Sequence, residues 1–250
     1  MEWTDEGIIL GLRRHGEGNA IVELMTAGHG RHLGLVRGGA SRRQAAGLQP
    51  GNAVRAVWRA RIDGQLGAYA LETLESRADR LMASACAAYA FAHLAALLRL
   101  LPERDPHPGL HAVLDAMMAL LDAPEPAAML VARFELLMLA ELGFGLELDR
   151  CAATGGRNDL RFVSPKSGRA VSGEAAGPWR DQLFALPFFL VGEVAEPPDR
   201  REIEAAYDLT GFFLRRRVLE PRGIGMPESR AAFLAALARR GKLRTPRPEG

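Results

Sequence analysis

Cysteine is scarce in this chain of 250 residues, which contains only Cys86 and Cys151. Two cysteines do not make the disulfide framework of a small secreted domain, so a reducing cytoplasm is the expected compartment. A structural zinc site needs four nitrogen or sulfur ligands. No further Cys and no His follows Cys151 in the sequence. The sequence therefore predicts no bound metal and no cofactor.

Motifs of catalysis are also missing. The six histidines are not accompanied by a Gly-x-Ser-x-Gly, a His-Glu-x-x-His or a Walker-type sequence. His29 and His32 lie in or beside predicted turns and are expected at the surface, whereas His93 lies in an apolar helical run and is expected in the core. These features predict a protein that is not an enzyme.

A long apolar run is absent as well. The nearest candidate, residues 81–101, contains His93, Arg99 and eight alanines. Alanine adds little to membrane insertion, so this run is interpreted as a buried helix. Residues 1–7 are polar and acidic and do not resemble a secretory signal.

Acidic residues are absent from residues 24–62, which carry seven arginines. These are Arg31, Arg37, Arg42, Arg43, Arg55, Arg59 and Arg61. A charge field of one sign attracts polyanions, and the commonest extended polyanion in a cell is nucleic acid. The alternative is an ordinary solvated surface, because Arg is the default basic residue of a chain whose only lysines are Lys166 and Lys242.

The first 76 residues carry the pattern of five short strands, at 7–12, 20–25, 31–36, 53–60 and 68–74. In the third strand Leu33 and Leu35 lie on the opposite face from His32 and Gly34. In the fourth, Trp58 lies opposite Arg55 and Arg59 and is expected in the core. Five such strands with a longer connection after the third predict a small closed barrel, of OB type or SH3-like.

Helical patterns dominate from residue 77 onward. They predict helices over residues 80–101, opened by a capping box of Ser76 and Asp79, and over 108–121 and 126–143. Two more are predicted, one capped by Asp199 and Glu202 and a last one after Pro227. Between residues 148 and 175 the helical pattern gives way to a compact turn-rich insertion.

Several short segments stand in an order and spacing that resemble one known family. They are EGIIL at 6–10, GEGNAIV at 16–22, TAGHG at 26–30, VRGGAS at 36–41, LQPG at 48–51, LGF at 142–144, LDRC at 148–151 and VSPKSG at 163–168. Together they resemble the RecO family of DNA repair proteins over nearly the whole length.

The resemblance implies an α+β chain: an OB-type β-barrel over residues 1–76, and a mostly α-helical domain over 77–250 with an embedded zinc-knuckle-like region at 148–175. Some members carry four zinc cysteines in that knuckle. Here only Cys151 stands at such a position, with Thr154 and Ser172 at two of the others, so a degenerate knuckle is expected.

The resemblance also implies a function, that of a recombination mediator in the RecF pathway. Such proteins bind single- and double-stranded DNA, anneal complementary strands, and act with RecR and the single-stranded DNA-binding protein to load RecA. The expected location is the cytoplasm, in association with the nucleoid. The alternative is a protein–protein adaptor whose barrel binds a protein partner without contacting DNA.

The candidate DNA-binding residues are arginines of the barrel and of one late helix. They are Arg31, Arg37, Arg42, Arg43, Arg55, Arg59, Arg215 and Arg216. The loop of residues 38–43 is the strongest patch, because its glycines allow close approach to phosphate and its arginines supply charge. Few aromatic residues occur in residues 1–76, so contacts are expected mainly to phosphates and without sequence preference. Of Arg215, Arg216 and Arg217, one is expected to pair internally, because three consecutive helical residues cannot share one face.

Overall fold

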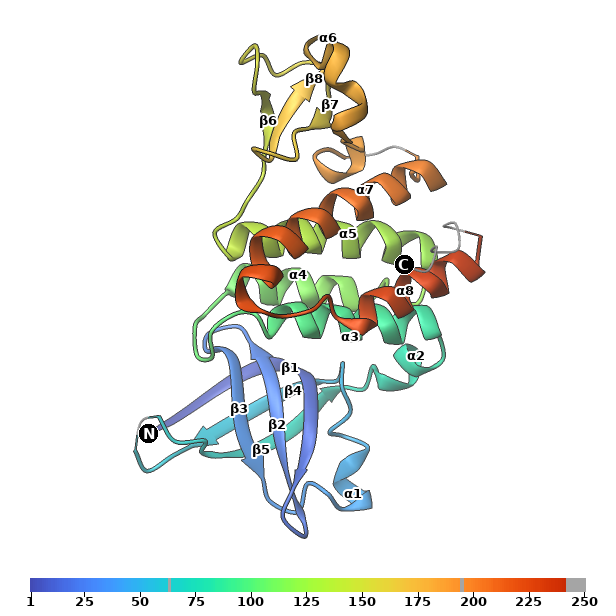
Figure 1. The fold of residues 1–250 in the computed structure, drawn as a ribbon. Coiled ribbons are helices and arrows are strands. Elements are labelled where there is room, and N and C mark those ends of the chain that lie inside the picture. Colours follow the sequence, from blue (N-terminus) through green and yellow to red (C-terminus); the bar gives the residue numbers. More distant parts are fainter. Residues whose placement is uncertain (63, 194–195, 242–250) are drawn as a thin grey trace. The chain divides into compact units, whose positions relative to one another are not determined.

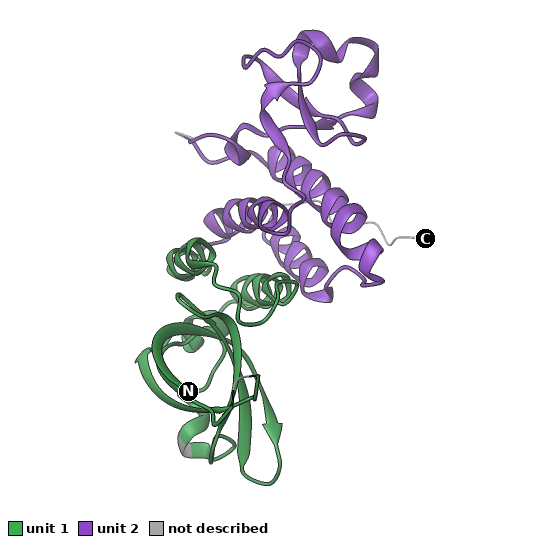
Figure 2. Cartoon of the chain, turned by 90° about the vertical axis from the view of Figure 1, so that its left-hand side faces the viewer, with its two compact units in different colours: residues 1–122 green, residues 123–250 purple. Residues whose placement is uncertain are grey.

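The computed structural model describes residues 1–62, 64–193 and 196–241, apart from the side chain of Arg43. The chain forms two compact units, Met1–Asp122 and Ala123–Gly250 (Figure 2). The first unit contains a β-barrel and three helices that follow it, and the second is mainly helical with a small sheet. The predicted α+β character is confirmed, with strands toward the N-terminus and helices toward the C-terminus.

Five strands close into a barrel in the order β1-β2-β3-β5-β4 (Figure 1). The strands are β1 (Glu2–His15), β2 (Asn19–Thr26), β3 (Gly30–Val36), β4 (Ala53–Arg59) and β5 (Ala68–Glu75). Neighbouring strands are antiparallel except β3 and β5, which run parallel and are joined at Leu35 and Ala68. All five predicted strands are therefore present.

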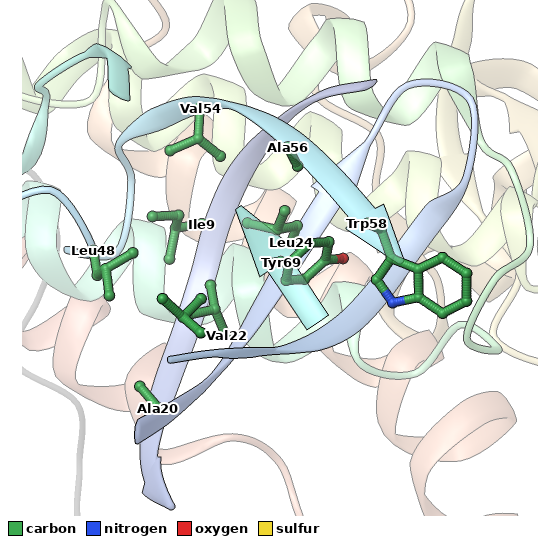
Figure 3. Packing of buried hydrophobic residues seen from close by; sticks show 10 residues of the cluster. Ile9, Ala20, Val22, Leu24, Leu48, Val54, Ala56, Trp58 and Tyr69 are labelled. Carbon is green, nitrogen blue, oxygen red and sulfur yellow. The ribbon is translucent and has the colours of Figure 1, made fainter. Parts of the chain in front are cut away.

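Alternating side chains fill the barrel with an apolar core (Figure 3). Its members are Ile9, Ala20, Val22, Leu24, Val36, Leu48, Val54, Ala56, Trp58 and Tyr69. Trp58 is buried, as the alternation of β4 predicts. In β3 the predicted alternation is confirmed, and the inward face is that of His32 and Gly34, which are buried, while Leu33 and Leu35 are half-buried. Gly34 is required here, because a Cβ would lie 2.3 Å from Cδ2 of Tyr69.

The connection between β3 and β4 contains the four-residue helix α1 (Arg42–Ala45). After the barrel come α2 (Ala78–Met82), α3 (Ala85–Leu98) and α4 (Pro108–Met118). Helix α3 contacts β1 and α4 contacts β2, so these helices belong to the same compact unit as the barrel. The compact units divide after Asp122; the domain boundary after residue 76 stays a prediction.

The predicted single helix over residues 80–101, with its capping box of Ser76 and Asp79, was wrong. The helix is interrupted, and the N-cap of α3 is Ser84, whose hydroxyl accepts a hydrogen bond from the backbone N–H of Ala87. Helix α2 begins without a side-chain cap of its own. Instead Oδ1 of the buried Asn52 accepts hydrogen bonds from the backbone N–H groups of Arg77 and Ala78, at 2.9 and 3.0 Å. A cap supplied from a distant loop leaves no local sequence signal.

The second unit is built on α5 (Pro124–Glu141), α7 (Arg200–Phe213) and α8 (Glu228–Arg239). The predicted capping box of Asp199 and Glu202 is present at the start of α7. Buried polar side chains join the three helices: Arg230 donates to Glu135 at 2.7 Å, and the hydroxyl of Thr210 donates to the same carboxylate. Helix α7 continues as the π-helical segment η3 (Leu214–Leu219) and the short turn η4 (Glu220–Arg222).

The insertion after α5 is a four-stranded sheet in the order β6-β8-β7-β9. Its strands are β6 (Glu147–Cys151), β7 (Leu160–Val163), β8 (Arg169–Ser172) and β9 (Phe184–Ala185), with α6 (Gly173–Ala176), η1 (Gly177–Gln182) and η2 (Phe188–Leu190) beside them. Within the described part of the chain, no helix is both long and apolar enough to cross a membrane.

Candidate nucleic-acid interface

A groove of about 920 Å³ lies against β4, β5 and the end of β3. Three arginines line it: Arg37, Arg59 and Arg61. Gln44 and Thr73 add polar groups, and none of the described residues that line the groove is Asp or Glu. The groove therefore carries positive charge in a concave surface, where the field on an approaching anion is strongest.

The loop after β3 presents two exposed arginines, Arg37 and Arg42. Gly38 has a φ of 68°, in the left-handed region that favours glycine, and its backbone N–H donates to Oδ1 of Asn19 at 3.1 Å. Neither arginine makes a side-chain hydrogen bond or ion pair with any residue that the structure describes. Both guanidinium groups are thus available to an external anion. The side chain of Arg43 lies outside the described residues.

Arg55 and Arg59 on β4 face carboxylates of the neighbouring strands. The antiparallel register places Glu2 opposite Arg59 and Glu6 opposite Arg55. The ion pairs measure 2.8 Å for Arg59 and Glu2 and 3.2 Å for Arg55 and Glu6, and Glu72 of β5 lies 3.5 Å from Arg55. The hydrogen bond from Arg59 lowers the pKa of Glu2 below its ordinary value. Two of the seven arginines in residues 24–62 therefore have their charge partly neutralised by carboxylates of neighbouring strands.

Arg31 on β3 is engaged inside the first unit. Its side chain is 13% exposed, and its Nη1 donates to Glu23 at 2.9 Å. Its Nε and Nη2 donate to the carbonyl oxygen of Leu101. This guanidinium ties β3 to the end of the α3 region, a position that does not favour the predicted contact with DNA.

Arg215 and Arg216 are exposed on η3 in the second unit. The guanidinium of Arg216 lies 5.7 Å from the ring centroid of Phe212. Arg217 donates to the carbonyl oxygens of Phe144 and Ser167. Arg217 therefore pairs internally, as was predicted for one of these three arginines.

Arg61 is the groove residue that was not among the predicted DNA contacts. It follows the last residue of β4 by two positions, so strand alternation could not place it. Its membership of the acid-free stretch was the available signal.

The second unit has a separate groove of about 1140 Å³ between the insertion and α7. Its lining includes the apolar side chains Leu136, Leu148 and Phe188, of which Phe188 is 62% exposed. Three arginines and four carboxylates also line it, so its charge is nearly balanced. Apolar surface of this kind suits a protein partner better than a phosphate backbone.

Cys151 lies at the end of β6, completely buried. Its sulfur accepts a hydrogen bond from the backbone N–H of Ser172 at 3.3 Å and lies 3.5 Å from the hydroxyl of the same residue. Burial raises the pKa of this thiol, but hydrogen bonds from Thr154 and Ser172 outweigh it and lower the pKa to about 6. One thiol with two hydroxyl neighbours does not fit a tetrahedral zinc site. Among the described residues, no three His, Cys, Asp or Glu side chains gather to hold a metal ion.

The histidines divide differently from the prediction. His93 is buried, as expected. His32 is 2% exposed, so its predicted surface position was wrong; it lies on the inward face of β3. His29 is half-buried, with Nδ1 2.9 Å from Asp5.

A small closed barrel with an arginine-lined groove defines a class: such barrels are common among proteins that hold nucleic-acid strands. Comparison with known proteins makes the assignment more specific. Residues 1–77 match the family model "Recombination protein O N terminal", and residues 83–223 match "Recombination protein O C terminal". The chain belongs to the RecO family of DNA repair and recombination proteins.

Curated relatives agree over nearly the full length. The chain is 61% identical over 239 residues to "DNA repair protein RecO" of Xanthobacter autotrophicus, covering 96% of this chain and 98% of the relative. It is 60% identical to the protein of that name from Mesorhizobium japonicum, and the match covers 95% of this chain and 94% of the relative. It is 58% identical to the protein of that name from Methylobacterium nodulans, and the match covers 94% of this chain and 97% of the relative. None of these descriptions names a catalytic activity.

Proposed function

We propose that this protein binds single- and double-stranded DNA in the barrel groove and anneals complementary strands as a recombination mediator, without catalysing a covalent step. One observation carries the proposal: the groove presents Arg37, Arg59 and Arg61, and no carboxylate among its described lining residues. Membership of the RecO family supports it.

The barrel is proposed to be of the OB type. Five strands closed in the order β1-β2-β3-β5-β4 fit the five-stranded Greek-key barrel that binds oligonucleotides. The N-terminal family match, which ends at residue 77, supports an OB domain over residues 1–76. The remaining residues, 77–250, would then form the helical domain.

Annealing follows from charge alone. Two DNA strands repel each other through their phosphates, and arginine side chains that contact both strands reduce this repulsion. Contacts to phosphates carry no sequence information. Arg37, Arg42 and Arg61 are proposed as the main contacts, because they are exposed and line the groove or its adjoining loop. Arg43, Arg55, Arg59, Arg215 and Arg216 are retained as secondary contacts, since Arg55 and Arg59 are paired with carboxylates. Arg31 is omitted.

The partners are proposed from the family resemblance. They are RecR and the single-stranded DNA-binding protein, and the outcome of their joint action is RecA loaded on single-stranded DNA at the nucleoid. The groove of the second unit, whose lining includes the apolar side chains Leu136, Leu148 and Phe188, supports the presence of a protein-binding surface.

The test is the salt dependence of single-strand binding by the variant Arg37→Ala/Arg61→Ala. Each lost phosphate contact lowers the slope of log affinity against log salt by about 0.7 on single strands, so the double variant is expected to lose about 1.4. The matched control is Arg150→Ala/Arg239→Ala, which removes two exposed arginines of the second unit. The control should keep the wild-type slope, and strand annealing should slow only in the groove variant.

An unchanged slope in the groove variant would remove the groove from the proposal. Absence of any DNA binding at low salt would favour the alternative, a protein–protein adaptor. Nuclease-treated pull-downs with the Phe188→Ala variant would then test the second groove.

A further inference from the structure

Aromatic rings gather at one end of the barrel. The Trp3 ring is stacked on His29, with ring centroids 4.1 Å apart and planes 10° from parallel. It is also stacked on Trp58 at 5.7 Å. His32 and Tyr69 meet the Trp3 ring edge-on. In Figure 3, Trp58 lies at the opposite end of the apolar cluster from Leu48.

These rings do not fill the end of the barrel. A pocket of about 360 Å³ remains, lined by Trp3, His29, His32, Trp58 and Arg104 among others. This volume falls within the range of about 300–1,000 Å³ that is typical of small-molecule sites. Trp3 and His29 are half-buried, so part of each ring is reachable from solvent.

His32 gives this pocket a fixed polar group. Its Nδ1 lies 2.9 Å from the carbonyl oxygen of Leu33. The hydroxyl of Tyr69 lies 3.0 Å from the same nitrogen. A carbonyl oxygen only accepts hydrogen bonds, whereas a hydroxyl can donate or accept, so both contacts are satisfied when Nδ1 carries the proton; Nε2 is then an acceptor. Within the described residues Nε2 has no hydrogen-bond partner, although the side chain is 2% exposed. Burial, and then the charge of Arg104, lower the pKa of His32 to about 4, so the ring is neutral at pH 7.

Arg104 is held beside the same rings by an unusual backbone. Its φ is 64°, a left-handed conformation that a non-glycine residue adopts at a cost. Its backbone N–H donates to the carbonyl oxygen of Arg31 at 2.8 Å, and its guanidinium lies 5.7 Å from the Trp58 ring centroid. The pocket thus combines aromatic faces, a cation and an unpaired acceptor. Its carboxylate, Glu2, is paired with Arg59.

We propose that this pocket receives one nucleobase of a DNA single strand whose phosphates lie in the arginine groove. The proposal rests on the proposed DNA binding and adds a base-stacking site to it. Glu2 lines the pocket, and its carboxylate lies 2.8 Å from the guanidinium of Arg59, which lines the groove. Met1 also lines the pocket, and its amino group donates a hydrogen bond to the carbonyl oxygen of Ala60, another groove residue, at 2.7 Å. A nucleotide bound through its phosphate in the groove therefore lies within reach of the pocket.

A nucleobase suits the pocket for two reasons. Every base has a π-face that stacks on Trp or His rings. The acceptor of His32 complements the exocyclic amino group of cytosine or adenine, which thymine lacks. The pocket should therefore favour amino-bearing bases over thymine.

The experiment measures the affinity of the wild-type protein for an oligodeoxycytidine and for an abasic oligomer of the same length, at one salt concentration. The oligodeoxycytidine is expected to bind roughly tenfold more tightly, the scale of one base stacked on an aromatic ring. The variant Trp3→Leu should abolish the difference and keep the abasic affinity. The control Trp179→Leu, which removes an exposed tryptophan of the second unit, should keep the difference.

The outcomes separate this pocket from the groove. Equal wild-type affinity for the two oligomers, or an unchanged difference in Trp3→Leu, would refute the base pocket and leave the groove intact. If the wild-type protein binds neither oligomer, the proposed function itself is refuted. Should Trp3→Leu fail to fold, His29→Ala takes its place, because that side chain is 36% exposed. His29→Ala is also expected to abolish the difference in affinity between the two oligomers. If this variant keeps the difference, the base pocket is refuted.

Discussion

The ion pairs of Glu2 with Arg59 and of Glu6 with Arg55 lead to a specific prediction: removing the two carboxylates should strengthen DNA binding. The pairs measure 2.8 and 3.2 Å and lie on exposed strands. The variant Glu2→Gln/Glu6→Gln keeps the side-chain size but leaves Arg59 without a carboxylate and Arg55 with Glu72 alone. Both guanidinium groups then become more available to phosphate.

The magnitude follows from counterion release. If each freed arginine gains one phosphate contact, the slope of log affinity against log salt becomes steeper by about 0.7 per contact on single strands, or about 1.4 for the double variant. The assay is fluorescence anisotropy of a labelled single-stranded oligomer over a salt series. Because exposed ion pairs contribute little to folding, the thermal midpoint should stay close to that of the wild type.

A matched control separates the local effect from net charge. The variant Asp181→Asn/Glu220→Gln removes two exposed carboxylates of the second unit and changes the net charge by the same amount. It should leave the slope unchanged. An equal slope in the wild type and the Glu2/Glu6 variant would refute the reasoning, because Arg55 and Arg59 would then not contact phosphate.

Three further predictions concern stability. Arg230→Met leaves the buried carboxylate of Glu135 without its partner and should cost about 3–5 kcal/mol in urea unfolding; a loss below about 1 kcal/mol would contradict this. Burial lowers the pKa of His32 in the folded protein to about 4, below its ordinary 6.5. The neutral ring therefore contributes fully to folding stability above pH 6.5, and this contribution is lost as the pH falls toward 4. In His32→Phe the thermal midpoint should depend less on pH over that window. Because the sulfur of Cys151 accepts a hydrogen bond from the backbone N–H of Ser172, EDTA should not shift the thermal midpoint. A lower thermal midpoint after chelation would indicate a bound metal.

Much of the fold follows from local patterns. The five strands of the barrel and the capping box of Asp199 and Glu202 were predictable, because alternation and end-capping act over a few residues. The start of α2 was not, because its first backbone N–H groups are capped by Asn52 from a distant loop. The inward face of β3 was also not predictable, since alternation defines two faces and only packing against Tyr69 selects the one with Gly34.

The candidate site shows the same division. The sequence by itself determined that residues 24–62 contain arginines and no acid, and it determined the order of segments that marks the RecO family. Only the tertiary structure decided which arginines stay available. Antiparallel pairing brings Glu2 and Glu6 opposite Arg59 and Arg55, and Arg31 turns to Glu23. Charge acts through space and not along the chain, so the distances between strands leave Arg37 and Arg42 as the exposed cations beside the groove.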